Sequence, residues 1–396
     1  MVGANESLRN LLILHPNMAF GGAERQLLNL VRALPETGGY TVTVALYELS
    51  GMLATELEAI KNVRVVDLCI GRKSSLTRIR VIRHFILDNS FDVVYSFLVG
   101  PNLLSALARF TGAKHFVVWG HRVSSFKYLE FGWKGVWASL LTRALVHQAE
   151  LIISNSEAGK QDLLRRRYPT KKIKVVPNGI DTIRFQENPA KRERFRAELG
   201  LTPDQLVVGQ IGRIVPWKGH DTFLRAASIL KKQIPDVVFL IVGSGEEDWV
   251  NHLQSLAEKL DLADALRWPG AMENVEDALN ILDILTVSSR SGEGFPNIIG
   301  EAMAVGVPVV GSDVGEIAAL LRDIGLLFHC DDPEDLATVW RRLALDVRLR
   351  GEMRSVSRRL VEKEFSITKM VERTASLLDA VGSTRANIHR SVDGKH

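Results

Sequence analysis

The segment from Ser288 to Glu316 carries the residues best suited to binding a polar ligand. Glu293 lies in a glycine-rich loop, and Glu301 follows eight positions later within the run IIGEAMAVG. Carboxylates accept hydrogen bonds from sugar hydroxyls, often two at once. Pro296 suits the first turn of a helix, so backbone amides of residues 294–297 would be free to meet hydroxyl oxygens. Glu301 alone is open to interpretation as an ordinary helix glutamate, which does not explain the whole stretch.

Two cations follow the apolar run Leu206–Gly212. Arg213 and Lys218 lie in the sequence GRIVPWKGHDTFLRA, in the loop before the next expected helix. Cations beside a helix start can clamp a diphosphate, because both they and the helix N-terminus favour phosphate oxygens. The alternative is a pair of solvated surface cations, as most lysines and arginines are. The place at the end of a strand favours the clamp.

A pair of glycines, Gly21 and Gly22, follows the first apolar run in the sequence NMAFGGAERQLLNLVRAL. They would let the backbone approach a ligand closely just before a helix. A paired glycine before a helix is also often only a turn, so this signal is weak by itself. The segment contains neither the G-x-G-x-x-G fingerprint nor the G-x-x-x-x-G-K-S loop, so the dinucleotide and P-loop hypotheses lose their main support.

The elements that must position these residues are short apolar runs alternating with helical patterns. Nearly continuous Val, Ile and Leu runs are typical of strands buried on both faces of parallel sheets, and their alternation with helices indicates an α/β fold. The runs are Leu11–Pro16, Thr41–Glu48, Val63–Leu68, Phe91–Leu98, His115–His121, Leu151–Ser156, Ile173–Pro177, Leu206–Arg213, Val237–Gly243, Ala265–Trp268, Ile281–Ser288, Pro308–Asp313 and Gly325–His329.

A polar segment without a strand divides these runs into two halves. We expect two doubly wound, Rossmann-like domains, over residues 1–180 and 205–370, joined by a linker with a short helix at 181–204. Residues 371–396 are expected to be the end of a terminal helix and a disordered tail, because the sequence after Gly382 is small and polar. Such sheets bind ligands beyond the carboxyl ends of their strands, so a cleft between the domains is the expected site.

The composition fits a globular protein, with 46% hydrophobic and 24% charged residues in 396. A net charge of +4 is too weak to indicate nucleic acid without a supporting patch. The two cysteines, Cys69 and Cys330, form neither a metal spacing nor a disulfide framework, which favours a reducing compartment. With no signal-peptide layout and no apolar run long enough to span a bilayer, we expect a cytoplasmic location.

Five motifs together resemble the retaining glycosyltransferases of family 4. They are the pattern E-x7-E from Glu293 to Glu301 with its GF and EAMAxGxPVV contexts, the GG loop, PNGID at Pro177–Asp181, GRxxxxKG at Gly212–Gly219 and VGSGEE at Val242–Glu247. The resemblance covers about the first 375 residues, and five motifs in register are more specific than any one. It implies the two-domain GT-B architecture, with a C-terminal helix returning to the first domain.

The resemblance also implies roles for individual residues. Arg213 and Lys218 would bind the diphosphate of a nucleotide sugar, with backbone of the Gly21–Gly22 loop opposite them. Glu301 would hold the ribose, and Ser244 and Gly245 would lie near the nucleotide. The sugar hydroxyls would meet Glu293, Gly294, Phe295, Pro296 and Asn297. His121 matches the family's histidine near the reacting sugar, although a lone histidine is more often structural.

The implied reaction moves a sugar, with retention of configuration, from a UDP-sugar to a glycan or lipid-linked acceptor in cell-surface polysaccharide or lipopolysaccharide synthesis. Arg213 and Lys218 would stabilise charge growing on the leaving diphosphate, with Glu293 as a hydroxyl ligand. No acidic pair with a metal-ligand layout flanks them, so no metal or other cofactor is expected. Two departures stand out: Glu316 and Ala319 replace a glycine and a glutamate common in the family, and the loop at Ser288 is unusually rich in serine.

Acceptor recognition is expected in the first domain, beside an anionic membrane surface. Basic residues next to aromatic ones suit such a surface or a lipid-diphosphate acceptor, and the alternative is a solvated helix face beside a partly buried aromatic helix. The expected membrane or acceptor residues are Arg72, Lys73, Arg78, Arg80, Arg83, Lys127, Trp133, Lys134 and Trp137.

Three other functions compete with the transferase hypothesis. A sugar-nucleotide epimerase on the same two-domain plan would need no acceptor, and the E-x7-E context and GG loop argue against it. A non-catalytic binding module on this fold is a second possibility, because fold does not determine function. Nucleic-acid binding is the weakest, since the cluster Arg165–Arg167 is not organised as a groove reader.

Overall fold

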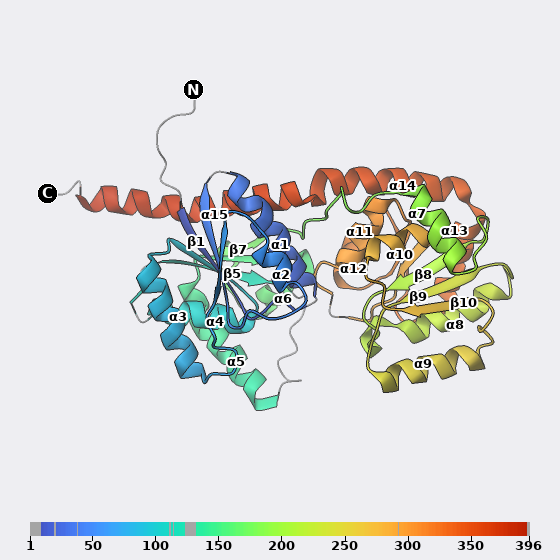
Figure 1. The fold of residues 1–396 in the computed structure, drawn as a ribbon, viewed down its shortest axis with the longest axis horizontal. Helices are drawn as coiled ribbons and strands as arrows, with labels where there is room; N and C mark the ends of the chain where they lie inside the picture. Colours follow the sequence, from blue (N-terminus) through green and yellow to red (C-terminus); the bar gives the residue numbers. More distant parts are fainter. Residues whose placement is uncertain are drawn as a thin grey trace, which may run out of the picture. The chain divides into compact units, whose positions relative to one another are not determined.

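The computed structural model describes residues 9–19, 21–37, 39–110, 112–113, 115–122, 132–291 and 293–393, with residues 132–134 and 382–393 described by their backbone alone (Figure 1). The chain divides into two compact units. The first comprises Met1–Gly179 together with Ile367–His396, and the second comprises Ile180–Ser366. Each unit is an α/β sandwich around one parallel sheet.

The first unit is built on a seven-stranded sheet in the order β3-β2-β1-β4-β5-β6-β7, with every neighbouring pair parallel. Its strands are β1 Arg9–His15, β2 Tyr40–Leu46, β3 Val63–Asp67, β4 Val93–Phe97, β5 Phe116–His121, β6 Leu151–Ser154 and β7 Ile173–Val175. Its α-helices are α1 Gly22–Ala33, α2 Ala54–Glu58, α3 Ser75–Asn89, α4 Val99–Phe110, α5 Gly132–Leu145, α6 Glu157–Arg165 and α15 Ile367–Asp393. Short 3-10 helices lie at Leu34–Thr37, Val146–Gln148 and Thr170–Lys172.

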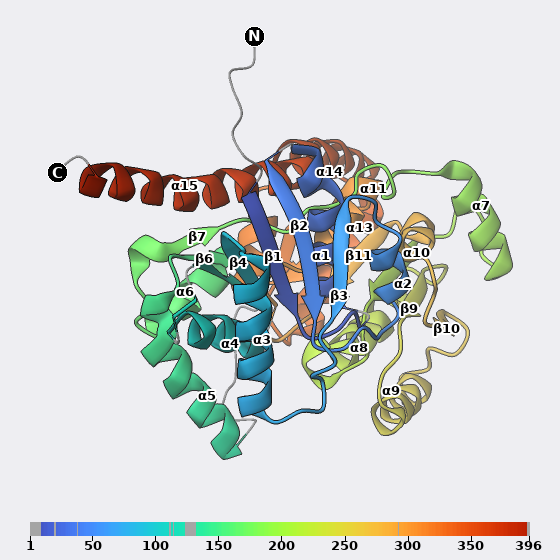
Figure 2. The same ribbon diagram turned by 60° about the vertical axis from the view of Figure 1, so that its left-hand side comes forward.

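Both faces of this sheet are covered, as continuous apolar strands require. Leu11 and Ile13 of β1 point to one face and pack in a core with residues of α1 and α15. Leu12 and Leu14 point to the other face and pack with residues of α3 and α4. Figures 1 and 2 show these helices on the two sides of the sheet.

The second unit is built on a six-stranded parallel sheet in the order β10-β9-β8-β11-β12-β13. Its strands are β8 Val207–Ile211, β9 Val238–Val242, β10 Leu266–Gly270, β11 Ile284–Val287, β12 Val309–Ser312 and β13 Leu326–Phe328. Its α-helices are α7 Pro189–Glu198, α8 His220–Lys231, α9 Glu247–Lys259, α10 Val275–Ile281, α11 Asn297–Val305, α12 Gly315–Leu321, α13 Pro333–Leu345 and α14 Val347–Leu360. A 3-10 turn spans Pro216–Lys218, and a π-helical turn spans Val361–Phe365.

Every apolar run expected to form a strand does so, and the two doubly wound sheets confirm the predicted fold class. The return of the C-terminal helix to the first unit is also confirmed. In α15, Asp379 accepts a hydrogen bond from Arg9 Nη1 at 3.1 Å and another from the Tyr40 hydroxyl. The structure continues this helix to Asp393, whereas we expected a disordered tail after Gly382.

The segment expected to be a linker is part of the second unit. Helix α7 packs against α10, and its N-cap Asn188 accepts a hydrogen bond from the amide of Lys191 at 3.0 Å. Arg196 is 3% exposed and donates to the carbonyls of Ile281 and Thr202 at 2.9 and 3.0 Å. The polar sequence of residues 181–204 suggested exposure to solvent. Arginines of this segment instead bind backbone carbonyls and the carboxylate of Asp283.

The buried contacts of Arg196 make a stability test. We expect Arg196→Met to lower the free energy of unfolding of the second unit by about 3 kcal/mol, because buried carbonyls and Asp283 would lose their partner. Arg194→Met on the same helix is the control, since its side chain is 66% exposed and its contacts, an ion pair with Glu198 and the ring of Phe195, are with neighbours on α7. Calorimetry measures both; equal transition temperatures for the two variants would contradict the role given to Arg196.

Candidate functional site

The candidate site of the second unit lies at the switch point of its sheet. Strands β8 and β11 are neighbours in the sheet. The chain continues from β8 to β9 towards one edge of the sheet, and from β11 to β12 towards the other edge. Loops that follow two such strands diverge at their carboxyl ends and leave space for a ligand. The loop after β8 carries Arg213 and Lys218, and the loop after β11 carries Glu293.

Lys218 and Glu293 meet at this point. The ammonium group of Lys218 contacts Glu293 Oε1 in an ion pair whose side chains are 16% and 13% exposed. The hydroxyl of Ser289 also donates to this carboxylate oxygen, at 2.9 Å. Two residues that we assigned to different parts of one ligand are therefore in direct contact, with their charges largely withdrawn from water.

The backbone of the Lys218 loop is held by side chains from both strands. Gln210 Nε2 donates to the carbonyl of Lys218 at 2.8 Å. The hydroxyl of Ser288 lies 3.0 Å from the same carbonyl and 2.9 Å from that of Gly219. Because these contacts are buried or partly buried, they hold the loop more strongly than exposed contacts would.

Arg290 is a positioning residue that we did not predict. Its guanidinium donates to Pro216 O, Asp221 Oδ2 and Asp331 Oδ1, each at 2.7 Å. The bond to Asp331 is the largest cause of a raised pKa of Arg290, with burial opposing it and Asp221 adding to it. Together, Ser288, Ser289 and Arg290 explain the serine-rich loop: each of the three holds either Glu293 or the Lys218 turn.

Arg213 differs from Lys218 in being free. Its side chain is exposed, and it makes no hydrogen bond or ion pair with any residue that the structure describes. It lies five residues before Lys218 in the same loop, so the loop presents one cation held by a carboxylate and one available to a ligand.

Glu301 lies in the middle of α11, past its first turn, and is partly buried. Burial alone would lower the pKa of Arg184. The pKa is nevertheless raised above its ordinary value, because Arg184 binds Glu276 and lies near the carboxylates of Glu301 and Asp181. Glu301 therefore belongs to a second charged group of this unit, together with Arg184 and Glu276.

The residues between the two glutamates divide into core and loop. Phe295 is 6% exposed and packs edge-on against Phe365, with ring centroids 5.5 Å apart, so its side chain belongs to the core. Gly294 is buried, and Pro296 is the N-cap of α11 rather than a residue of its first turn. Asn297 begins the helix and is partly buried.

The turn after β9 packs directly on the Arg213 loop. The amide of Ile214 donates to the carbonyl of Ser244 at 2.8 Å. A β-carbon on Gly245 would lie 2.0 Å from the carbonyl oxygen of Ile214, which only glycine avoids. The side chain of Ser244 is exposed. Gly245 thus has a packing role whether or not a nucleotide lies beside it.

In the first unit, the predicted residues follow β1 and β5. Gly21 is the N-cap of α1, and a β-carbon there would lie 2.4 Å from Glu24 Oε2. Gly22 is exposed at the first position of the helix. Glu24, in the first turn, already places a negative charge near this helix start.

His121 is the last residue of β5 and is partly buried, with its carbonyl accepting from the amide of Asn155 at 3.1 Å. The next residue, Arg122, was not predicted. Its guanidinium donates to the Tyr95 hydroxyl and to Asn178 Oδ1 at 3.1 and 3.2 Å. A basic residue directly after a buried strand was the signal that could have identified it.

The expected membrane or acceptor residues have different surroundings. Arg72, Lys73 and Arg80 are exposed, Arg83 is partly buried, and Trp137 is 59% exposed. Arg78 is partly buried: its guanidinium binds the carbonyls of Ile70, at 3.1 Å, and of Gly71, and lies 5.6 Å from the centre of the Tyr47 ring. Lys127 lies outside the described residues, as do the side chains of Trp133 and Lys134.

Gly219 provides a test of the Lys218 loop. It has φ +68°, and a β-carbon there would lie 2.1 Å from the carbonyl oxygen of Ser288. We expect Gly219→Ala to displace the loop, lower the melting temperature and abolish nucleotide binding measured by calorimetry. Gly200→Ala is the matched control, because Gly200 has the same φ of +68° with open space around its Cα. It should lose only about 1 kcal/mol of stability, from backbone strain. Equal effects of both variants would contradict the packing argument.

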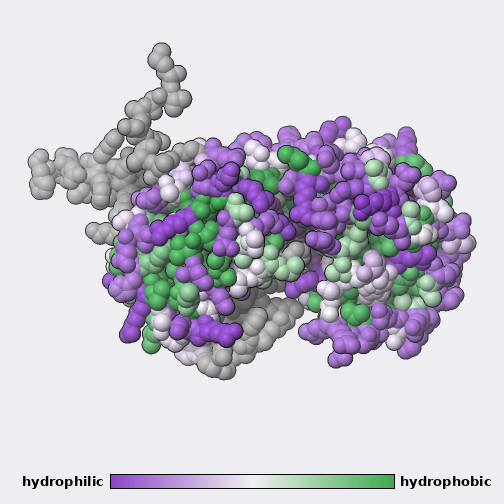
Figure 3. Space-filling view, viewed as in Figure 1, coloured by the Kyte–Doolittle hydropathy of each residue, from purple (hydrophilic) through white to green (hydrophobic). Residues whose placement is uncertain are grey.

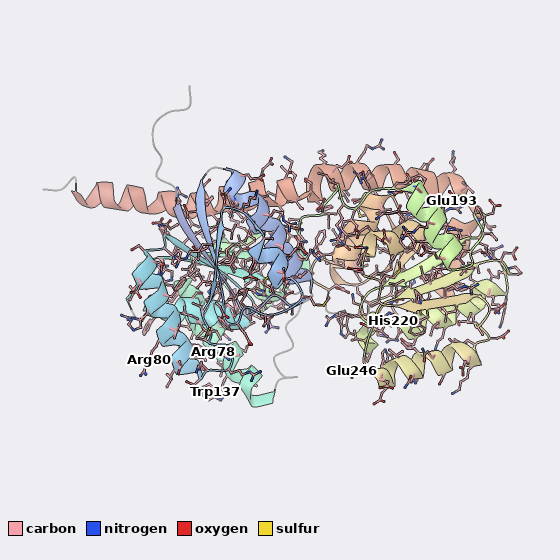
Figure 4. All side chains as sticks on the ribbon, viewed as in Figure 1. Arg78, Arg80, Trp137, Glu193, His220 and Glu246 are labelled. Carbon is pink, nitrogen blue, oxygen red and sulfur yellow. The ribbon has the colours of Figure 1, made fainter. Side chains whose placement is uncertain are left out.

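His220, beside Lys218, predicts loss of stability in acid. Burial, and then the charge of Lys218, lower its pKa to about 4 from 6.5, and its ring nitrogens have no hydrogen-bond partner among the described residues (Figure 4). Between these values the unfolded chain binds a proton that the folded chain does not. Burial of neutral His220 therefore contributes its full share to the free energy of unfolding above pH 6.5. This contribution, about 3 kcal/mol, is lost as the pH falls towards 4.

The variant His220→Met should lose less stability than the wild type between pH 7 and pH 5 in urea titrations. His252→Met, which replaces an exposed histidine of α9, is the control and should follow the wild type. Identical pH dependence for His220→Met and the wild type would contradict this assignment.

Comparison with known proteins bears on both units. A family model described as Glycosyltransferase Family 4 matches residues 20–184, and one described as Glycosyl transferases group 1 matches residues 191–359. The D-inositol 3-phosphate glycosyltransferase of Actinosynnema mirum is 33% identical over 219 residues, which are 52% of each chain. EpsF of Bacillus subtilis is 25% identical over 315 residues, covering 78% of this chain and 80% of its own. The chain thus spans about half the length of the inositol-phosphate relatives it matches.

Solved structures agree on the fold. HepE of Anabaena in complex with UDP has a TM-score of 0.81 and 23% identity, covering 94% of this chain and 100% of its own. WaaG, a glycosyltransferase involved in lipopolysaccharide biosynthesis, has a TM-score of 0.71 and 17% identity, covering 93% and 99%. One family model lies on each side of residues 185–190, and together the two match most of the chain, so the protein belongs to the group 1 glycosyltransferases of family 4.

Proposed function

We propose that the protein transfers a sugar from a nucleotide-diphosphate donor to a glycan or lipid-linked acceptor, with retention of configuration. The observation that carries this proposal is the Lys218–Glu293 pair at the switch point, beside the free cation of Arg213. A diphosphate needs cations, a sugar needs carboxylates for its hydroxyls, and both kinds of group are held here on adjacent loops.

A UDP-sugar is the donor that we propose. Structures similar to this one are those of Anabaena HepE in complex with UDP, with UDP and glucose, and with UDP-glucose. Their likeness to this chain supports a uridine nucleotide, and the type of sugar is outside the proposal. The expected roles of Glu301 at the ribose, and of the loop from Gly294 to Asn297 at the sugar, belong to the same proposal.

The chemistry follows from the charge that develops. When the sugar leaves, negative charge grows on the diphosphate, and cations held beside it lower the energy of this state more than that of the bound donor. Lys218 is positioned for this by Gln210 and Ser288, which hold its backbone. The ion pair with Glu293 neutralises the buried ammonium until a phosphate arrives, and Glu293 then becomes available to sugar hydroxyls.

The first unit supplies the remaining parts of the proposed site. His121 and the Gly21–Gly22 loop, at the carboxyl ends of β5 and β1, are the residues of the first unit assigned to the reacting sugar and donor. No metal is needed in this proposal, because Arg213 and Lys218 supply the positive charge. Synthesis of cell-surface polysaccharide or lipopolysaccharide is the proposed setting. The free thiols of Cys69 and Cys330 suit a cytoplasmic location.

Slow hydrolysis of UDP-glucose tests donor use without knowledge of the acceptor. We expect Lys218→Ala to lower the rate of UDP release about 30- to 1000-fold, equivalent to about 2–4 kcal/mol of transition-state stabilisation. Lys232→Ala is the control, because Lys232 is an exposed lysine at the end of α8. An unchanged rate for Lys218→Ala would remove Lys218 from the clamp.

The same reaction, followed by proton NMR, identifies its class. A retaining transferase should release the α-anomer of glucose first, and UDP should raise the melting temperature more than ADP or GDP. An epimerase would instead convert UDP-glucose into another UDP-sugar without releasing glucose. A binding module would respond to UDP without turnover.

A further inference from the structure

Helix α5 presents its large apolar side chains to solvent. Val136, Trp137, Leu140 and Leu141 are 41%, 59%, 54% and 45% exposed. They recur at positions i, i+1, i+4 and i+5, which lie on one face of a helix. In a helix of an isolated globular unit this face would point to the core.

The opposite face of α5 carries the small residues. Gly135 is buried, Thr142 is 3% exposed, and Ala138 and Ser139 are partly buried. Helix α5 packs against α4, which in turn packs against α3, so the three helices form one layer of the first unit (Figure 2). The helix thus packs through its small residues and leaves its large apolar ones for something outside the described chain.

Basic residues accompany this apolar face. Helix α5 contains no Asp or Glu, and its Arg143 is exposed. On α3 and the loop before it, Arg72, Lys73 and Arg80 are exposed. Trp137 and Arg80 lie on the same side of the unit (Figure 4), and on the face of this unit seen in Figure 3 apolar areas are bordered by hydrophilic residues.

Two occupants fit an apolar helix face, and charge distinguishes them. A second copy of this chain would bring the same basic residues of α3 and α5 towards each other, and like charges oppose association. An anionic bilayer complements both features: apolar side chains enter the boundary between headgroups and acyl chains, while Lys and Arg bind the lipid phosphates. No helix within the described residues has the length and apolar character to cross a bilayer.

We propose that the exposed faces of α3, of the loop before it from Arg72, and of α5, defined here as the docking surface, bind an anionic lipid bilayer. The docking surface adds Val136, Leu140 and Leu141 to the residues expected from the sequence and removes Arg78. Helices α3 and α5 follow the carboxyl ends of β3 and β5, the edge of the sheet that also carries His121. Docking there brings this edge close to lipid headgroups. Resting on the proposed function, it assigns the acceptor to the lipid-linked class.

Flotation with vesicles tests the docking surface in the full-length protein. At 50 mM salt, wild-type protein should float with vesicles of 70% phosphatidylcholine and 30% phosphatidylglycerol, and float much less with phosphatidylcholine alone or at 500 mM salt. Leu140→Gln/Leu141→Gln should weaken binding at least tenfold. Its control is Leu345→Gln/Val347→Gln in the second unit, where the side chains are 67% and 68% exposed. Glutamine keeps the helix propensity of these positions.

The charge of the docking surface has its own pair of variants. Arg72→Gln/Arg80→Gln should weaken vesicle binding about 25-fold, from about fivefold for each cation near an anionic surface. Lys232→Gln/Lys259→Gln, which removes two exposed lysines of the second unit, should bind as the wild type does.

Three results would overturn the proposal. They are no flotation of the wild type at 50 mM salt, equal losses in test and control variants, and a dimer in light scattering that the Leu140/Leu141 variant dissolves while no vesicles bind. Hydrolysis of UDP-glucose without vesicles separates this proposal from the proposed function. It should be unchanged in Leu140→Gln/Leu141→Gln. If the wild type floats but neither hydrolyses UDP-glucose nor gains melting temperature from UDP, the proposed function fails while the docking surface stands.

Discussion

The contact between Lys218 and Glu293 depends on the parallel arrangement of β8 and β11. Each side chain is carried by a loop, and a loop by itself would not hold two opposite charges together away from water. The amide of Gln210 in β8 and the hydroxyl of Ser288, directly after β11, bind the carbonyls of the Lys218 turn, and Arg290 connects that turn to Asp221 and Asp331. The Lys218 loop is therefore held by its own hydrogen bonds, and ligand binding need not order it.

This arrangement also gives the ion pair a function beyond stability. A partly buried lysine paired with a carboxylate is neutral as a pair, so without a ligand the site costs less than a lone ammonium at the same place would. In the proposed function, a diphosphate beside Arg213 would give the ammonium of Lys218 a second anionic partner. Binding of phosphate and release of the Glu293 carboxylate would then be linked, because both anions compete for the same ammonium group.

The strands could be predicted from sequence because burial on both faces of a parallel sheet demands continuous apolar runs. The charged residues were harder to assign, because the sequence does not say whether a cation meets solvent, a carbonyl or a carboxylate. Arg78, counted among exposed basic residues, binds backbone carbonyls, and Arg196, in a segment expected to be a linker, is buried. Arg290 was overlooked because its partners, Asp221 and Asp331, are distant in sequence and become neighbours only in the folded sheet.

The return of α15 to the first unit has a consequence for synthesis on the ribosome. The second unit, Ile180–Ser366, is continuous in sequence and can fold as soon as it has emerged. The first unit cannot be completed at that stage, because Met370 and Leu378 of α15 belong to its core. The hydroxyl of Tyr40 also lacks its hydrogen-bond partner until Asp379 has been synthesised. The half of the protein that is made first is thus finished last. Until translation ends, the apolar face of its sheet needs protection from aggregation, by a chaperone or by fast arrival of the remaining chain.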